Sequence, residues 1–349
     1  MSSSDRDNII NQPWPEADLE YLGRCPLCGS AQRTLLYEGL RDRVFFCAPG
    51  SWTLHRCGGC KSAYLDPRPI PESMGRAYEQ YFTHQNEDQH APASFLKRIK
   101  QLVKNGYLNR KWETSLSPAS PMLSMLLPKS IKAFIDEGIM RHLPRPSGGR
   151  ALLDVGCGDG QFLALASSAG WRVTGFDPDP KAVHHARSRG LDVQLGGFET
   201  LQQASDCFDA ITVSHVIEHV YDPKELMANC YRLLKPGGYF WIETPNINSY
   251  GHSEFKGDWR GLEPPRHLQL VSWELLQVLL DEAGFNHVAP AAWRPLNWIV
   301  NGASKAIQFY EDPGRMKLTY FDLIKNQFVE LRNRVDHTRR EFITLHATK

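Results

Sequence analysis

Three glycines at every second position, Gly156, Gly158 and Gly160, follow the apolar residues 151–155. The apolar run is typical of a buried strand, and the residues after the loop have the spacing of an amphipathic helix. Glycine allows a sharp turn and lets a ligand lie against the backbone with no Cβ between. Because ligands bind at the carboxyl ends of strands in parallel α/β sheets, we predict a ligand-binding loop here, ordered by Asp154.

The glycine spacing and a second acidic residue restrict which class of ligand-binding loop this can be. The spacing is G-x-G-x-G, which differs from the G-x-G-x-x-G of dinucleotide-binding loops. No lysine followed by serine or threonine begins the helix, so a P-loop is excluded. A second predicted strand, residues 171–177, ends in Asp177, the kind of acid that accepts hydrogen bonds from ribose hydroxyls. A tight turn without a ligand is the alternative, and the downstream residues disfavour it.

Three further segments continue the pattern in order: a short strand at 191–196, a fourth strand at 208–214, and a turn into a fifth strand at 233–242. Together these features resemble the class I S-adenosylmethionine (SAM)-dependent methyltransferases. The resemblance implies an α/β fold with a Rossmann-like, seven-stranded sheet, and SAM as the cofactor. It implies cofactor contacts from Asp154, Gly156, Cys157, Gly158, Gly160, Asp177, Pro178, Phe198, Ser214 and His215.

Length and composition suggest an ordinary protein of two domains. The chain has 349 residues, 42% of them hydrophobic and 23% charged, with a net charge of +1. That charge argues against a globally basic nucleic-acid binder. The first residues have no apolar signal segment, and no run approaches the roughly 20 apolar residues that span a bilayer. We therefore expect a cytoplasmic protein whose eight cysteines are reduced or bound to metal.

Four cysteines form two C-x-x-C pairs, Cys25 with Cys28 and Cys57 with Cys60. Two such turns facing each other create a tetrahedral sulfur site that suits zinc, and the 28 residues between the pairs suit a ribbon of two hairpins. Disulfides or unrelated cysteines are the alternatives, and a reducing compartment disfavours them. Because four thiolates leave no position for an activating water, we predict a structural zinc ion, with Cys47 in the core.

The ribbon leads into a tyrosine-rich segment that contains Tyr78 and Tyr81. This layout resembles zinc-ribbon-fused methyltransferases of bacterial polysaccharide and secondary-metabolite clusters, including deoxysugar C-methyltransferases. The resemblance implies that the two tyrosines line the acceptor site; packing between ribbon and main domain is the alternative. The expected organisation is a disordered lead (1–18), a small zinc-ribbon domain (19–70), a helical linker or cap (71–147) and the methyltransferase domain (148–349).

Residues 93–145 have apolar side chains at helical spacing and are basic, with ten lysines and arginines against three acids. Three interpretations remain open: a solvated cap, a lid over an anionic substrate, and a basic amphipathic helix that contacts a membrane surface. Pro118, Pro121 and Pro128 divide the region into short pieces, which favours a cap or lid. The apolar positions that give the helical spacing are Phe95, Leu96, Ile99, Leu102 and Val103.

The C-terminal third is expected to complete the sheet. Ser272 is predicted to cap a helix over 273–283 that ends at Gly284, and a sixth strand follows at 285–289. Residues 341–349 alternate and are predicted as the last strand, inside the sheet. Residues 290–338 then form a helical insertion, which either covers the acceptor cleft or forms a dimer face. We expect a monomer or a homodimer.

Histidines are the candidate general bases. A sulfonium methyl group is already activated, so an enzyme must mainly align the nucleophile and exclude water, but a sugar hydroxyl is a weak nucleophile that a base assists. Histidine is the usual base near neutral pH. His219, beside Glu218 after the fourth strand, and His267, on a later loop, are the candidate catalytic residues; a hydrogen-bonded core histidine is the alternative for each.

The sugar C-methyltransferase resemblance departs in two places: those enzymes have a further C-terminal domain, and a tyrosine where this chain has Val216. We therefore expect in-line methyl transfer to a hydroxyl of a saccharide, nucleotide-sugar or related small metabolite. Sugar C-methylation, an RNA methyltransferase with an RNA-binding ribbon, and a non-catalytic SAM-binding module are the alternatives. A nucleic-acid partner is not expected, because the ribbon is not conspicuously basic and no Asn/Asp-Pro-Pro-Tyr motif follows strand four.

Overall fold

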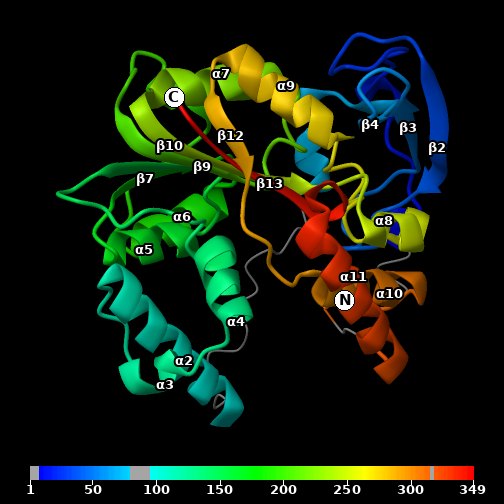
Figure 1. Cartoon of the computed structure of the whole chain (residues 1–349). Coiled ribbons are helices and arrows are strands. Elements are labelled where there is room, and N and C mark those ends of the chain that lie inside the picture. Colours follow the sequence, from blue (N-terminus) through cyan, green and yellow to red (C-terminus); the bar gives the residue numbers. More distant parts are fainter. Residues whose placement is uncertain (1–7, 79–94, 315–317) are drawn as a thin grey trace.

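The computed structural model describes residues 8–78, 95–314 and 318–349. A seven-stranded sheet in the order β12-β13-β10-β9-β6-β7-β8 lies at its centre (Figure 1). The five neighbouring strands β10, β9, β6, β7 and β8 run parallel to one another. Strand β13 runs antiparallel to both of its neighbours. The strands are β6 (Ala151–Val155), β7 (Arg172–Asp177), β8 (Val193–Leu195), β9 (Phe208–Ser214), β10 (Leu234–Pro245), β12 (Asn286–Pro290) and β13 (Phe342–Thr348). The Rossmann-like α/β sheet with seven strands is the one predicted.

Helices cover both faces of this sheet. In Figure 1, α5 and α6 lie on one face and α7 and α9 on the other. Their bounds are α5 (Gln161–Ser168), α6 (Pro180–Ser188), α7 (Pro223–Leu233) and α9 (Trp273–Ala283). The predicted boundaries of α9 are confirmed: the Ser272 hydroxyl accepts a hydrogen bond from the Leu275 N–H, and Gly284 ends the helix in the left-handed conformation.

The predicted last strand is confirmed as well. In β13 the side chains alternate between buried and half-buried, and Ile343, Leu345 and Ala347 are at most 1% exposed. Every residue of β6 is buried, as a strand covered by helices on both faces must be. The sheet therefore holds the end of β6 rigidly beside the ends of β7 and β9.

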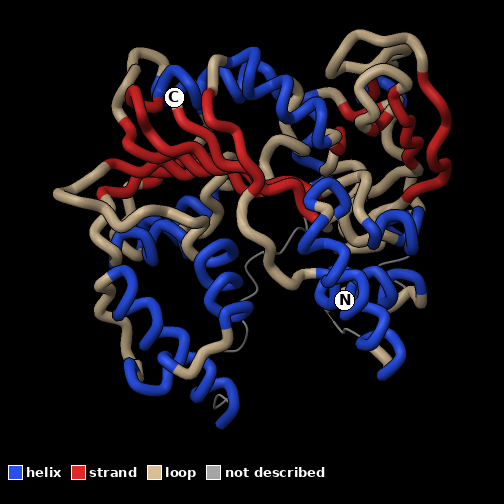
Figure 2. The backbone as a smooth tube through the Cα atoms, in the orientation of Figure 1, coloured by secondary structure: helices blue, strands red, loops and turns tan. Residues whose placement is uncertain are grey.

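The N-terminal part forms a second sheet, visible at the right of Figure 2, in the order β11-β4-β3-β2. Its strands are β2 (Arg33–Leu40), β3 (Trp52–Cys57), β4 (Ala63–Leu65) and β11 (Gln269–Leu270), and a separate pair joins β1 (Leu19–Glu20) to β5 (Arg68–Pro69). Since β11 comes from the predicted methyltransferase domain and pairs with β4, Gln269 opposite Tyr64, this sheet is completed by residues 205 positions away in the sequence. One hydrophobic cluster holds Cys57 and Tyr64 together with Trp273. The expected boundary between a ribbon domain and a catalytic domain is therefore bridged by a shared core.

The lead was expected to be disordered over residues 1–18, and this is wrong for residues 8–18. Ile10 and Trp14 are buried, and the Trp14 ring packs edge-on against Trp52 at a centroid distance of 5.3 Å. The two prolines that suggested disorder, Pro13 and Pro15, instead flank this buried tryptophan. Residues 1–7 lie outside the described part of the chain.

The region between the two sheets is helical, as predicted, but its buried face is different. It contains α2 (Phe95–Trp112), α3 (Pro121–Met125), α4 (Lys129–Phe134) and a π-helical turn at Ile135–Ile139. The buried hydrophobic side chains of α2 are Tyr107, Leu108 and Trp112. The predicted apolar positions Phe95 and Leu96 are 76% and 68% exposed, so they do not pack into the core.

The C-terminal insertion is helical as expected, with α10 (Asn297–Gln308) and α11 (Tyr320–Val335). The short helix α8 (Tyr250–Phe255), which lies between β10 and β11 in the sequence, contacts α10. Short 3-10 turns lie at Glu16–Asp18, Pro71–Ala77, Phe198–Leu201, Lys256–Asp258 and His337–Arg339. Among the helices of the described residues, none is long and apolar enough to cross a membrane.

A buried ion pair joins the N-terminal part to the loop before β11. The Arg266 guanidinium donates to both carboxylate oxygens of Asp42, at 2.6 and 3.1 Å, and both side chains are fully buried. Arg266 also donates to the Ala77 carbonyl oxygen at 3.2 Å. Burial alone raises the pKa of Asp42, but Arg266 outweighs it and holds that pKa below its ordinary value.

Removing one partner of this pair is expected to destabilise the fold strongly. Arg266→Leu leaves the Asp42 charge buried without its cation, which costs about 3–5 kcal/mol in the free energy of unfolding. Urea denaturation followed by circular dichroism measures this. The matched control is Lys224→Ala, because the pair of Lys224 with Glu282 is solvent-exposed and contributes little. A loss for Arg266→Leu no larger than that of the control would contradict the role given to the pair.

Candidate functional site

The glycine loop lies at the carboxyl end of β6, and all three glycines have left-handed φ angles of +66°, +56° and +76°. A Cβ on Gly156 would lie 2.6 Å from a methyl of Val216, and one on Gly160 would lie 2.5 Å from Leu191. Packing and backbone conformation therefore both require glycine at these two positions. A Cβ on Gly158 would meet no atom within 4 Å, so the middle of the loop faces open space where a ligand can approach.

Asp177 connects the ends of β7 and β6. One of its carboxylate oxygens accepts the Gly158 N–H at 2.8 Å, and the other accepts the Asp179 N–H at 2.9 Å. The carboxylate therefore lies beside the glycine loop, as expected for an acid that accepts hydrogen bonds from ribose hydroxyls. The acid is thus held against the open glycine, and it orders the loop.

The remaining predicted cofactor residues lie at or just after the carboxyl ends of strands β6 to β9. Phe198 packs edge-on against Phe176 at 4.9 Å, just after β8, and Pro178 follows Asp177 at the start of the turn into α6. Ser214 is the last residue of β9 and is half-buried. The buried Cys157 side chain points to Gly175 of β7, where a Cβ would lie 2.7 Å from its sulfur, so Cys157 offers a ligand its backbone rather than its thiol.

The expectation that Asp154 orders the glycine loop is corrected by the structure. Its buried carboxylate pairs with Arg141 and accepts the Thr212 hydroxyl at 2.7 Å, so these bonds go to the helical region and to β9. Arg141 also stacks over the Phe162 ring, at 3.7 Å from its centroid. Arg141 brings a cation to the end of β6, and the sequence reasoning missed it. A basic residue shortly before the strand was the available signal, but it was counted only as part of a basic region.

His215, just after β9, lies between two buried carboxylates. Its Nδ1 is 3.2 Å from Glu218 and its Nε2 is 3.5 Å from Glu243. Burial alone lowers the pKa of His215, but the two carboxylates outweigh it and raise this pKa to about 9. Against the effect of burial, His215 lowers the pKa of Glu218 to about 2, and Arg294 together with His215 lowers that of Glu243 to about 2. At neutral pH His215 is therefore an imidazolium ion, which makes it unsuited to act as a base.

His219 and His267 meet, although 48 positions separate them. Their rings pack edge-on with centroids 4.8 Å apart. The Nδ1–H of His219 donates to the Arg266 carbonyl oxygen at 2.9 Å, and that of His267 donates to the Gly261 carbonyl oxygen at 2.8 Å. These bonds fix the tautomer in which Nε2 carries the lone pair. Burial lowers the pKa of each histidine below its ordinary value, so both are neutral at pH 7.

The two histidines differ in access. His267 is 5% exposed, whereas His219 is half-buried and has the Tyr78 hydroxyl 3.4 Å from its Nδ1. His219 is thus the one that an acceptor could reach, with Tyr78 beside it. Tyr81, the other tyrosine predicted to line an acceptor site, lies outside the described residues. Val216, which stands where the predicted resemblance to sugar C-methyltransferases would have a tyrosine, packs against Gly156.

Glu218, His219 and His267 can also be considered as cation ligands. Each offers one ligand atom, and these atoms lie within 4.8 Å of one another. The Glu218 oxygens are already 3.2 Å from His215 Nδ1 and 2.9 Å from the Thr244 hydroxyl, which donates to one of them. The Glu218 oxygens therefore already make contacts within the protein, which makes these three residues less suited to bind a cation.

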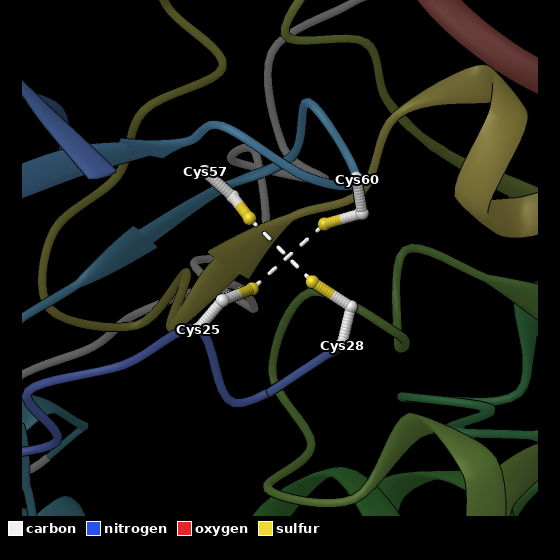
Figure 3. A group of neighbouring side chains, drawn as sticks. All are labelled: Cys25, Cys28, Cys57 and Cys60. Carbon is white, nitrogen blue, oxygen red and sulfur yellow. Dashed lines mark hydrogen bonds between the residues drawn. The ribbon is translucent and has the colours of Figure 1, made fainter. Parts of the chain in front are cut away.

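The four predicted zinc ligands come together. In Figure 3 the sulfur atoms of Cys25, Cys28, Cys57 and Cys60 point toward a common centre. The Cys25–Cys60 and Cys28–Cys57 sulfur separations are 3.8 and 3.5 Å, and all four sulfurs lie within 4.8 Å of one another. Four thiolates about 2.3 Å from a zinc ion in a tetrahedron are about 3.8 Å apart, so the cluster fits this metal. Cys47 is buried elsewhere, beside Asp42.

Comparison with known proteins identifies the central part of the chain. Residues 129–289 match the model of a methyltransferase domain. A probable SAM-dependent methyltransferase of Mycolicibacterium smegmatis is 32% identical over 151 residues, which cover 43% of this chain and 57% of that protein. The ubiquinone biosynthesis O-methyltransferase of Caulobacter vibrioides is 35% identical over 127 residues, covering 33% and 50%. The chain thus spans about half the length of these curated relatives.

Solved structures include a SAM-dependent methyltransferase from Archaeoglobus fulgidus, with 24% identity, 62% of this chain and 93% of that chain covered, and a TM-score of 0.45. That similarity is too low to indicate a function. The matched family model, the curated relatives and the observed sheet agree on one conclusion. This chain contains a class I SAM-dependent methyltransferase domain.

Proposed function

We propose that the protein transfers the methyl group of SAM to a hydroxyl of a saccharide, a nucleotide-sugar or a related small metabolite. The observation that carries this proposal is the neutral His219 with its unprotonated Nε2, on the stretch after β9 whose Val216 packs against Gly156 of the glycine loop. A base of this kind is what a weakly nucleophilic hydroxyl needs. The Caulobacter relative is named as an O-methyltransferase, which supports oxygen as the acceptor atom.

SAM supplies an activated methyl group when it is bound, and the protein supplies binding and alignment. Gly158 offers an open backbone, and Asp177 offers carboxylate oxygens for the ribose hydroxyls. Arg141 at the end of β6 is suited to the carboxylate of the methionine part. His219 is placed to take the proton of the acceptor hydroxyl on Nε2, and bound SAM would supply the methyl group and leave as S-adenosylhomocysteine. His267 packs against His219 and keeps its ring in place.

The zinc-ribbon assignment is also a proposal, supported by the sulfur geometry. A zinc ion bound by Cys25, Cys28, Cys57 and Cys60 would tie the N-terminal sheet together and take no part in methyl transfer, because all four positions are filled by thiolates. The Ser272 hydroxyl that begins α9 donates to the Cys60 carbonyl oxygen at 2.7 Å. The metal would thus support the methyltransferase sheet through α9.

Cofactor binding is expected to depend on Asp177. Isothermal titration with S-adenosylhomocysteine should show binding by the wild type and its loss in Asp177→Ala, because the ribose contact and the order of the loop both depend on this carboxylate. Asp206→Ala is the control, since Asp206 pairs with Lys349 away from the loop. Absence of binding by the wild type would overturn the cofactor site, and equal affinity in Asp177→Ala would overturn the role of this residue.

His219 is expected to be needed for methyl transfer but not for cofactor binding. His219→Gln should lower the rate of methyl transfer to screened nucleotide-sugars and glycans by about 10²–10⁴-fold and leave S-adenosylhomocysteine affinity unchanged. Because burial lowers the pKa of His219, the base form persists below the ordinary histidine pKa, and kcat/KM should fall only under about pH 6.5. Mass spectrometry of the product identifies the methylated atom. An unchanged rate in His219→Gln would exclude this histidine as the base.

The four-cysteine cluster is expected to bind zinc. Elemental analysis should find one zinc ion per chain, and Cys57→Ser or a strong chelator should remove it and lower the melting temperature, because the ion cross-links two turns of the N-terminal sheet. Cys207→Ser is the control, since Cys207 lies outside the cluster. Wild type that holds no zinc as purified would contradict the assignment, and zinc-loaded wild type that melts at the same temperature as Cys57→Ser would contradict the stabilising role of the ion.

A further inference from the structure

Helix α11 has its apolar side outward. Its apolar residues at spacings of three and four fall on one helical face, and they are exposed. The exposed fractions are 74% for Phe321, 40% for Ile324, 63% for Phe328, 56% for Leu331 and 87% for Val335. Burial of such a stripe is the usual outcome in a globular protein. Its exposure indicates a surface that binds another protein or a membrane.

Polar contacts fix this orientation of α11. The buried face carries Asn326, Glu330 and Asn333. Asn326 accepts from the Asn301 side chain at 2.7 Å, and Glu330 accepts from the Asn297 N–H at 2.9 Å and from the Trp293 indole at 3.1 Å. Rotating the helix to bury its apolar stripe would break all of these bonds in the interior. The outward apolar face is therefore fixed by these buried polar contacts.

A second exposed apolar surface lies on α2 and α3, and it is basic. Phe95 and Leu96 of α2 are mostly exposed, as are Met122 and Met125 of α3 and the next residue, Leu126, at 77%, 60% and 79%. The 18 residues of α2 include six lysines and arginines and no acid. The whole chain has a net charge of +1, so this positive charge is local.

The two surfaces lie on the same side of the molecule. In Figure 1, α2, α3 and α11 all lie on the side of the central sheet that carries α5 and α6, whereas α7 and α9 cover the other side. The sequence places them far apart, one before β6 and one between β12 and β13. Two separate segments thus place helices that carry exposed apolar side chains on one side of the fold.

We propose that this side docks on an anionic lipid surface, with the exposed apolar side chains of α2, α3 and α11 entering the headgroup region. Amphipathic helices with apolar and basic residues bind in this way, since burial of apolar area adds to attraction by anionic headgroups. A second copy of the chain is the less suitable occupant, because α2 would face the same six cations on its partner.

Vesicle sedimentation tests this with the full-length protein. Wild type should bind vesicles of phosphatidylcholine with phosphatidylglycerol at least about tenfold better than phosphatidylcholine alone, and high salt should reduce the difference. Phe321→Ser with Phe328→Ser, and separately Arg98→Gln with Lys100→Gln, should each weaken binding to the anionic vesicles several-fold. Val278→Ser is the matched control, because Val278 is 48% exposed on α9, on the other side of the sheet, and its loss should leave binding unchanged.

Each variant is first checked by circular dichroism and by titration with S-adenosylhomocysteine, so that loss of folding is separated from loss of docking. Wild type that ignores anionic vesicles would overturn the proposal, as would equal binding by all variants. Binding to both kinds of vesicle regardless of salt would overturn the role given to α2. A dimer in light scattering that Phe321→Ser with Phe328→Ser dissociates, without vesicle binding, would assign the apolar face to a second copy instead.

Discussion

The buried Arg266 side chain is the contact on which the arrangement of the site depends. Its guanidinium bonds to Asp42 of the N-terminal part and to the carbonyl oxygen of Ala77, next to Tyr78. Its own carbonyl oxygen accepts the Nδ1–H of His219, and the next residue is His267. One residue therefore connects the N-terminal part, the residue before Tyr78 and both candidate bases, and its buried charge is satisfied by this arrangement.

The cofactor side of the site depends on a different kind of constraint. Parallel strands bring the ends of β6, β7 and β9 to one edge of the sheet, and glycines with left-handed φ angles let the chain turn there without side chains. Asp177 then joins two of these ends through backbone N–H groups. This part of the site is rigid because main-chain hydrogen bonds hold it, whereas the acceptor side is assembled from side chains of distant segments.

The N-terminal part and the methyltransferase part share one interior. β11 completes the N-terminal sheet, and the Ser272 N–H and hydroxyl bond to the Ser62 hydroxyl and the Cys60 carbonyl oxygen. A zinc ion in the cysteine cluster would thus stabilise the start of α9 as well as the ribbon. Exposed apolar surface, by contrast, is concentrated on helices added to this frame, α2, α3 and α11.

Much of this protein could be read from the sequence, where the signal is local. Strand alternation, the glycine triplet, helix caps such as Ser272 and the C-x-x-C spacing depend on residues a few positions apart, so the central sheet, the end of α9 and the cysteine cluster were predictable. Whatever depends on distant partners was not. The bond of Asp154 to Arg141, the burial of Trp14, the meeting of His219 with His267 and the inward polar face of α11 were decided by tertiary packing. Buried polar groups must find partners wherever the fold brings them, and periodicity alone does not say which face of a helix those partners will claim.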